Sequence, residues 1–152
     1  MTTFLSSYTN SIDKKSRVSV PASFRTEIAN CSRQTIVVYK AVNESFLFAW
    51  SYDDFLLFAD KIKKLPTLSK QRQRLSRTIL AAAKPLQIDS DGRMNLPEEF
   101  ANSLKLDGKV MFAGQGEYFT IWNPNDFEAQ ALDDMEFYDN DIEILNQQEE
   151  LI

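Results

Sequence analysis

One 13-residue pattern occurs twice in this chain, at residues 12–24 and 88–100, a separation of 76 residues. Both copies begin with Ile-Asp, carry Arg at the sixth position and Pro at the tenth, and end with Phe. An internal repeat constrains architecture more strongly than local propensity does. We therefore expect two modules with the same local fold.

Each copy is predicted to form a strand, a tight turn, a second strand and a short helix. Asp13 and Asp89 favour a turn because their carboxylates accept hydrogen bonds from backbone amides just downstream, and Gly92 can adopt positive φ without steric cost. Apolar and polar residues then alternate after Arg17 and Arg93, as expected of a half-buried strand. The proline that follows in each copy suits the start of a helix.

The repeat continues beyond this unit. Residues 36–39 and 110–113 are apolar runs expected of buried strands, and residues 46–50 and 118–122 form a second pair. A Trp-x-x-x-Asp-Phe pattern begins at Trp50 and again at Trp122, a separation of 72. The first half therefore has four extra residues, and we expect them in a longer loop around Asn43 and Glu44.

Two further segments have distinct compositions. An apolar stripe predicts a helix that begins at Asp53 or Asp54 and ends before Pro66, and a second helix with a basic outer face is expected over residues 69–83. That basic face is either solvated or contacts phosphate or a neighbouring acidic surface. Residues 133–143 contain six acids and no base. Such runs are usually mobile, although the apolar residues here also permit a docked helix or a partner-binding tail.

Several functional classes are excluded or disfavoured. The chain contains no His, which excludes Ser-His and Cys-His catalysis and the usual zinc sites, and its four glycines form no phosphate-binding loop. Cys31 is the single cysteine and cannot form an internal disulfide. We expect no enzymatic activity, no cofactor, no metal and no small-molecule substrate. Without a leader or an apolar run of about 20 residues, no membrane association is expected and the predicted location is cytoplasmic.

Charge is distributed unevenly along the chain. Residues 1–93 contain 15 Lys and Arg against 8 Asp and Glu, a net charge of +7, whereas residues 94–152 contain 2 against 14, a net charge of −12. The total of −5 therefore conceals a cationic first part. Such a chain can present a positive surface to phosphates while the rest of its surface remains anionic.

The two repeat copies differ in the same sense. Residues 13–25 carry a net charge of +3 and residues 89–101 a net charge of −3. We therefore predict that the first copy binds an anionic partner and that the second is structural. The predicted binding residues are Lys14, Lys15, Arg17 and Arg25, and the predicted structural residues are Asp13, Asp89, Gly92 and Arg93. In the alternative interpretation both copies are structural, and both arginines form ion pairs within their turns.

These motifs resemble the MraZ family of bacterial transcriptional regulators, which belongs to the AbrB-like swapped-hairpin proteins. The resemblance rests on the doubled Asp-x-x-x-Arg motif followed by an apolar, polar, apolar, Pro run, and on two downstream segments, Phe112-Ala113-Gly114-Gln115-Gly116 and Phe119-Thr120-Ile121-Trp122. It covers roughly residues 4–130. One position departs from the family pattern: Ser16 precedes Arg17 where the family usually has Gly, and a left-handed Ser costs on the order of 1 kcal/mol.

The resemblance implies an α+β fold in which two tandem AbrB-like modules form one pseudo-dimeric, β-barrel-like unit. The implied divisions are a first module at 5–52, a helical connector at 53–84, a second module at 85–130 and an acidic tail at 131–152. It also implies homo-oligomers that close into rings, nucleoid association, and double-stranded DNA as partner. By this resemblance, the DNA-contacting arginine of the family corresponds to Arg17 of this chain.

The sequence thus predicts a DNA-binding transcriptional regulator that acts on short promoter repeats of the division and cell-wall gene cluster. The alternative is an oligomeric scaffold whose acidic tail and basic connector bind protein partners, without specific DNA binding.

Overall fold

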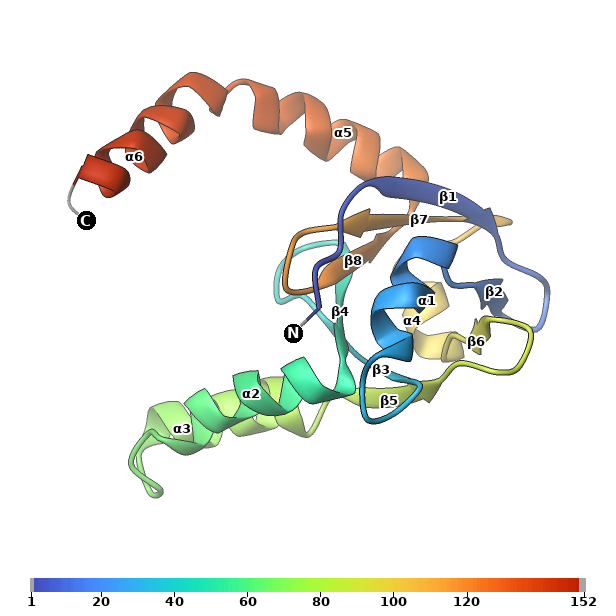
Figure 1. Ribbon diagram of the computed structural model, residues 1–152, viewed down its shortest axis with the longest axis horizontal. Helices are drawn as coiled ribbons and strands as arrows, with labels where there is room; N and C mark the ends of the chain where they lie inside the picture. The colour runs from blue at the N-terminus through green and yellow to red at the C-terminus, as the bar shows by residue number, and fades with distance from the viewer. Residues whose placement is uncertain (1, 151–152) are drawn as a thin grey trace.

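A computed structural model describes residues 2–150 as a mixed α+β protein built around antiparallel strands (Figure 1). A six-stranded sheet has the order β1-β7-β8-β4-β3-β5, and a separate two-stranded ribbon pairs β2 with β6. The strands are β1 (Ser7–Ser11), β2 (Arg17–Ser19), β3 (Thr35–Lys40), β4 (Phe46–Ser51), β5 (Lys84–Gln87), β6 (Arg93–Asn95), β7 (Lys109–Gly114) and β8 (Phe119–Trp122).

The helices are α1 (Ala22–Ala29), α2 (Tyr52–Lys63), α3 (Lys70–Leu75), α4 (Glu98–Ser103), α5 (Pro124–Met135) and α6 (Tyr138–Glu150). A short π-helical segment, η1 (Ser76–Leu80), continues α3. Among the helices of residues 2–150, none combines the length and the apolar character needed to cross a bilayer.

The two halves of the chain exchange strands. β1 from the first half pairs with β7 from the second, β5 from the second half pairs with β3 from the first, and the ribbon joins one strand from each half. Although the turn after β1 is tight, β1 and β2 therefore do not form the simple hairpin expected from sequence. An Ile12–Val18 bridge and a hydrogen bond from the side-chain amide of Asn10 to Ser19 O connect them. Strand pairing interlocks the halves into one unit.

Within residues 2–150 the sheet remains open, and the β-barrel-like closure expected from sequence does not occur. β1 and β5 lie at its two edges without pairing to each other, and β2 and β6 form their own ribbon. Besides two smaller clusters that lie elsewhere on the sheet, one apolar core cluster occupies the space between ribbon and sheet, with contributions from both and from α1 and α4. The residues that contribute include Val18, Met94, Phe24, Phe100 and Phe119.

Strand registers show where the four extra residues of the first half lie. In the first half Thr35 of β3 pairs with Gln87, and in the second half Lys109 of β7 makes the equivalent pair with Ser11. Equivalent residues of β3 and β7 are therefore 74 positions apart in the sequence, and those of β4 and β8 are 72 apart. Two of the extra residues therefore precede β3, where α1 has eight residues and α4 six. Only the other two lie in the β3–β4 loop, so the prediction that all four lie there was only partly correct.

The connector helices begin and end differently from prediction. Ser51 caps α2 by accepting a hydrogen bond from the Asp54 amide, and the buried Asp54 carboxylate instead accepts bonds from the Thr2 amide and hydroxyl. The second helix starts as expected, after the Ser69 cap, but it changes to π geometry at Ser76 and ends before Ala83. The pair α2–α3 projects from the body (Figure 1).

The acidic end of the chain is helical. α5 begins on the body at its Asn123 cap, extends away from it and continues through residue 131, where sequence suggested the tail would begin (Figure 1). α6 follows after a break at residues 136–137 and stands away from the rest of the molecule (Figure 1).

Candidate functional site

The two Asp-x-x-x-Arg motifs form turns with the same backbone hydrogen bonds. Oδ1 of Asp13 accepts from the amides of Lys15 and Arg17, each at 2.9 Å, and Oδ1 of Asp89 accepts from the amides of Asp91 and Arg93 at the same distances. These bonds favour the ionised form of each aspartate, so the pKa of Asp13 and that of Asp89 are lowered, with the amide of the motif arginine as the largest cause. Both carboxylates are therefore fixed parts of the turns.

The residue before each arginine has left-handed backbone geometry. Ser16 has φ of 62° and Gly92 has φ of 79°. The serine that departs from the family pattern thus retains the turn conformation, at a cost of about 1–2 kcal/mol relative to a right-handed residue.

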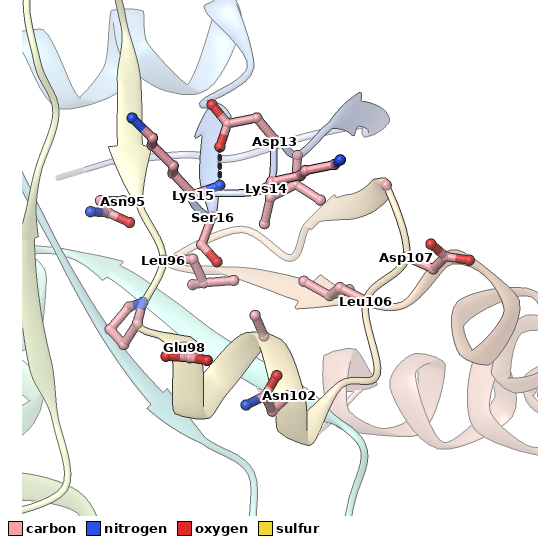
Figure 2. Close-up of a pocket in the computed structure, with 14 residues that line it drawn as sticks. Asp13, Lys14, Lys15, Ser16, Asn95, Leu96, Glu98, Asn102, Leu106 and Asp107 are labelled. Carbon is pink, nitrogen blue, oxygen red and sulfur yellow. Dashed lines mark hydrogen bonds between the residues drawn. The ribbon is translucent and has the colours of Figure 1, made fainter.

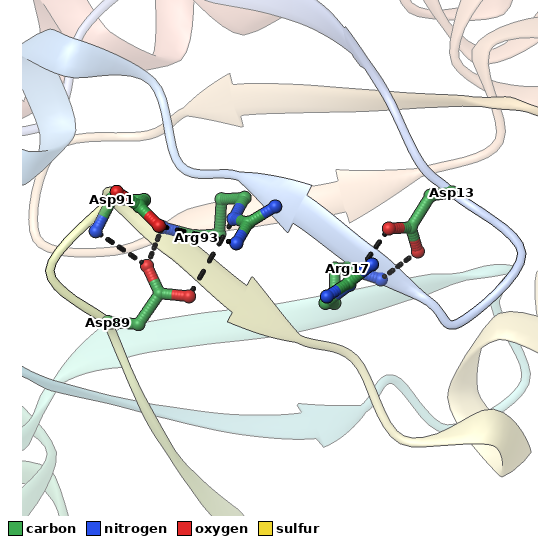
Figure 3. A network of polar contacts seen from close by, with 5 residues as sticks. All are labelled: Asp13, Arg17, Asp89, Asp91 and Arg93. Carbon is green, nitrogen blue, oxygen red and sulfur yellow. Dashed lines mark hydrogen bonds and ion pairs between the residues drawn. The ribbon is translucent and has the colours of Figure 1, made fainter.

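The turns lie at opposite ends of the β2–β6 ribbon (Figure 3). Val20 donates its amide to Gly92 O, and Leu96 donates its amide to Ser16 O, so each strand is extended by the turn of the other half. The ribbon therefore has approximate two-fold symmetry and brings both motifs into one surface.

Ribbon register separates an exposed face from a buried one. Val18 pairs with Met94, and both side chains are buried in the core. The alternate pairs, Arg17 with Asn95 and Ser19 with Arg93, point the other way because side chains alternate along a strand. Arg17, Ser19, Arg93 and Asn95 thus form one face, which we call the ribbon face.

Ion pairs engage the two arginines differently. Nε of Arg17 lies 2.9 Å from Asp13 Oδ2, and no described residue accepts a hydrogen bond from its Nη atoms. Arg93 approaches two carboxylates, Asp89 at 3.7 Å and Asp91 at 3.4 Å (Figure 3). Both arginines thus form ion pairs within their turns, as the alternative interpretation predicts. The Nη groups of Arg17 nevertheless donate no hydrogen bond to any described residue.

Positive side chains lie at both ends of the ribbon. Lys14 and Lys15 are exposed in the first turn, and no carboxylate among the described residues is within ion-pair distance of either. At the second turn the corresponding positions are Ser90 and Asp91. The positive charge there comes instead from Arg25 of α1, which reaches across from the other half.

Arg25 lies directly over Gly92. A Cβ added at Gly92 would be 1.8 Å from a terminal guanidinium nitrogen of Arg25, and the Arg25 Nε is buried without a hydrogen-bond partner in the described residues. Gly92 therefore favours the turn in two ways: it adopts positive φ without strain, and it leaves room for the Arg25 side chain.

The corresponding position at the first turn is open. Ala101 of α4 occupies the repeat position of Arg25, and a groove of about 1070 Å³ lies between α4 and the Asp13 turn (Figure 2). Ser16, Lys15, Asn95, Leu96 and Glu98 are among its lining residues. No arginine lies over Ser16, whereas a Cβ at position 92 would require Arg25 to move.

The structure places the predicted charged residues in an arrangement that the sequence did not predict. Lys14, Lys15 and Arg17 lie together at one end, and Arg25 lies at the other, beside the turn that contains Asp89, Gly92 and Arg93. Asn95 and Ser19 were not among the predicted binding residues, although the alternation of polar and apolar residues in the two strands was a signal for them. Cys31 is partly buried and desolvation raises the pKa of its thiol, which opposes formation of a nucleophilic thiolate.

Comparison with known proteins identifies the family. The chain is 38% identical over 125 residues to the transcriptional regulator MraZ of Pelagibacter ubique (strain HTCC1062), an alignment that covers 82% of this chain and 81% of the relative. The chain belongs to the MraZ family. A second MraZ, from Hyphomonas neptunium (strain ATCC 15444), is 37% identical over 130 residues, with 85% of this chain and 78% of the relative covered.

Other comparisons agree with this assignment. The MraZ of Rickettsia canadensis (strain McKiel) is 32% identical over 128 residues, covering 84% of this chain and 86% of the relative. The family model of the antitoxin-like MraZ protein matches residues 79–144, which include the second Asp-x-x-x-Arg motif, β7, β8 and α5. The MraZ relatives align well beyond that model, over both repeat halves.

The contact between Arg25 and Gly92 leads to a first prediction. Gly92→Ala should lower the free energy of unfolding by about 1–2 kcal/mol from positive φ, and by more where Arg25 is forced out of its position. Combining it with Arg25→Ala should recover the second part. Ser16→Gly is the matched control and should change stability by less than about 1 kcal/mol, because greater freedom in the unfolded chain offsets the relief of strain. Chemical denaturation compares the wild type, Gly92→Ala, Arg25→Ala, the double variant and Ser16→Gly. Equal losses from Gly92→Ala with and without Arg25 would contradict the contact.

Proposed function

We propose that this chain is a sequence-specific, double-stranded-DNA-binding transcriptional regulator. Two observations support the proposal: its MraZ relatives are named transcriptional regulators, and the ribbon face has positive side chains at both ends. The ribbon carries the argument, because a two-stranded β-ribbon fits the major groove of B-DNA, where base pairs present distinguishable donors and acceptors.

Each side chain of the surface has a distinct role in this proposal. The free Nη atoms of Arg17 donate to O6 and N7 of guanine, while Lys14 and Lys15, on the adjacent turn, contact phosphates. Arg25 contacts phosphate at the opposite end of the ribbon, through the outward part of its guanidinium. Asp13, Asp89, Gly92 and Arg93 maintain the turns. None of these roles needs a cofactor, and the proposed function is not catalytic.

Strand exchange between the halves supports a finer assignment of the fold. We propose that residues 5–52 and 85–130 are two AbrB-like, swapped-hairpin modules that form a pseudo-dimer, joined by the connector at 53–84 and followed by the tail at 131–152. Copies of this unit assemble into a closed ring in the nucleoid. Several weak contacts to short promoter repeats of the division and cell-wall gene cluster then add through effective concentration.

A protein-interaction scaffold without specific DNA binding is the second candidate. One observation favours it: apolar side chains of the α5–α6 arm are exposed, among them Leu132, Met135 and Phe137. The scaffold and the regulator differ in one measurable property, which is discrimination between a promoter fragment with its repeats intact and the same fragment with the repeats shuffled.

Fluorescence anisotropy with these two labelled fragments tests the proposal. We expect tighter binding to the intact repeats, and specific DNA complexes typically exceed non-specific ones by a factor of about 10³–10⁷. Equal affinity for both fragments at moderate salt would exclude the regulator and leave the scaffold.

Salt dependence separates the phosphate contacts from base recognition. Each of Lys14→Ala and Lys15→Ala should weaken binding to both fragments and reduce the slope of log affinity against log salt by about 0.9, the value for one phosphate ion pair. Lys61→Ala, which removes an exposed lysine of α2, is the matched control and should leave the slope unchanged. An equal reduction in all three variants would mean that the first turn makes no particular phosphate contact.

A further inference from the structure

Helix α6 presents apolar and acidic side chains to solvent. Residues 138–150 contain five acids and no base. Tyr138, Ile142 and Leu145 follow each other at i, i+4 and i+7, which places them on one side of the helix. The exposed fractions of Tyr138 and Leu145 are 54% and 52%, values unusual for apolar residues of a helix that had found its packing partner.

A helix of this length needs such a partner. Isolated helices shorter than about 12–15 residues are marginal in water, and most helical stability in proteins comes from packing an amphipathic face. α6 has 13 residues and stands away from the body (Figure 1). Its apolar side is therefore expected to pack against another surface.

The surface of this chain that complements α6 is on α3 and η1. Lys70, Arg74 and Arg77 are exposed and spaced at i, i+4 and i+7, and residues 70–80 include no acid. None of the three is within ion-pair distance of a carboxylate in the described part of the chain. Leu68, 83% exposed, and Leu75, 38% exposed, add apolar area to the same segment. We call these five residues the basic stripe.

The path of α5 places α6 away from the body, where it forms no ion pair with the basic stripe among the described residues (Figure 1). Phe127 packs edge-to-face on Trp122 with ring centroids 5.6 Å apart, and Asn123 both caps α5 and donates to the carbonyls of Leu104 and Lys105. These contacts fix the start of α5 on the body, and α5 carries α6 away from it (Figure 1). The three cations of the basic stripe have no carboxylate within ion-pair distance among the described residues, so the stripe is open to a second molecule while α5 stays in place.

We propose that α6 of one copy docks on the basic stripe of a second copy. Tyr138, Ile142 and Leu145 cover Leu68 and Leu75. Asp139 and Asp141, which flank that side of α6, pair with cations of the stripe, and Glu143 adds to the negative charge of the helix. Because donor and acceptor surfaces differ, the contact is head-to-tail, so successive copies form a ring if the rotation closes and a filament if it does not. The inference rests on the assembly within the proposed function and is independent of DNA recognition.

Charge reversal on each side tests the contact in the full chain. One variant carries Asp139→Lys, Asp141→Lys and Glu143→Lys, and a second carries Lys70→Glu, Arg74→Glu and Arg77→Glu. A third combines all six changes. The control carries Glu44→Lys, Glu117→Lys and Glu128→Lys, which produces the same charge change as the first variant at exposed acids outside the contact. Sedimentation velocity at micromolar concentration gives the mass of each, with circular dichroism to check that it is folded.

We expect each three-residue variant to fall at least twofold in average mass, and the six-residue variant and the control to keep the wild-type mass. Recovery in the six-residue variant is the decisive result, because damage to either helix alone would not be repaired by a second reversal. Unchanged mass in the single-side variants, or no recovery in the combined one, would overturn the docking. A monomeric wild-type protein would instead refute the proposed assembly itself, while the DNA measurements would stand separately.

Discussion

Phe119→Ala should destabilise the protein by about 3–5 kcal/mol, because it leaves a cavity at the centre of the core. Phe119 is fully buried in β8, and its ring lies 5.0 Å from that of Phe4, 4.8 Å from Phe24 and 6.1 Å from Phe112. These partners come from the first residues of the chain, from α1 and from β7. One truncation thus removes contacts that join both halves.

The expected drop in melting temperature is about 6–20 °C for a domain of this size, measured by calorimetry at fixed protein concentration. Leu5→Ala is the control, because Leu5 follows Phe4 in sequence but is 67% exposed, and its truncation should change the free energy of unfolding by less than about 0.5 kcal/mol. Similar losses for the two variants would mean that the aromatic cluster does not connect the halves.

The repeat predicted local structure well because the chemistry of the turns is local. Asp13 and Arg17 are four residues apart, and their hydrogen bonds depend on little beyond that segment. Strand partners are different, since β1 could pair with β2 or with any other exposed edge. The exchange that pairs β1 with β7 depends on contacts across about a hundred residues, and no local pattern encodes it.

Capping shows the same distinction at a smaller scale. Sequence offered Asp53 or Asp54 as the cap of α2, and both residue types are good caps. In the structure Ser51 takes that role, because Asp53 bonds Ser32 and Asp54 bonds Thr2. Each carboxylate was diverted by a partner far away in sequence. Arg25 is a parallel case at the candidate site: its charge was visible, but its place over Gly92 follows from the interlocking of the halves.

Arg17→Ala should abolish discrimination between intact and shuffled promoter repeats while leaving the fold intact. A bidentate arginine contact to guanine is worth about 1–3 kcal/mol, a factor of about 10–100, and it would be missing from every copy that engages a repeat. Stability should change by less than about 1 kcal/mol, because the ion pair with Asp13 is exposed on both sides. Arg17→Lys is the sharper variant: it keeps the charge but not the two-pronged donor geometry, so non-specific affinity should persist while specificity falls.

Arg93→Ala should have the opposite profile, although the structure brings both arginines to the ribbon face. Asp89 and Asp91 both approach the Arg93 guanidinium, and its Nε is buried, whereas Arg17 has one carboxylate and two neighbouring lysines. The net charge of the first turn is therefore positive, whereas Asp89 and Asp91 balance Arg93 and Arg25 at the second, so we expect phosphates to be attracted more strongly to the first turn. We expect Arg93→Ala to lower stability by about 1 kcal/mol and to keep most of the specific affinity.

Anisotropy and thermal melting of Arg17→Ala, Arg93→Ala and the double variant decide between the copies. Loss of specificity in Arg93→Ala as large as in Arg17→Ala would make both turns part of the DNA-recognition surface, because the two-fold symmetry of the ribbon would then outweigh its difference in charge.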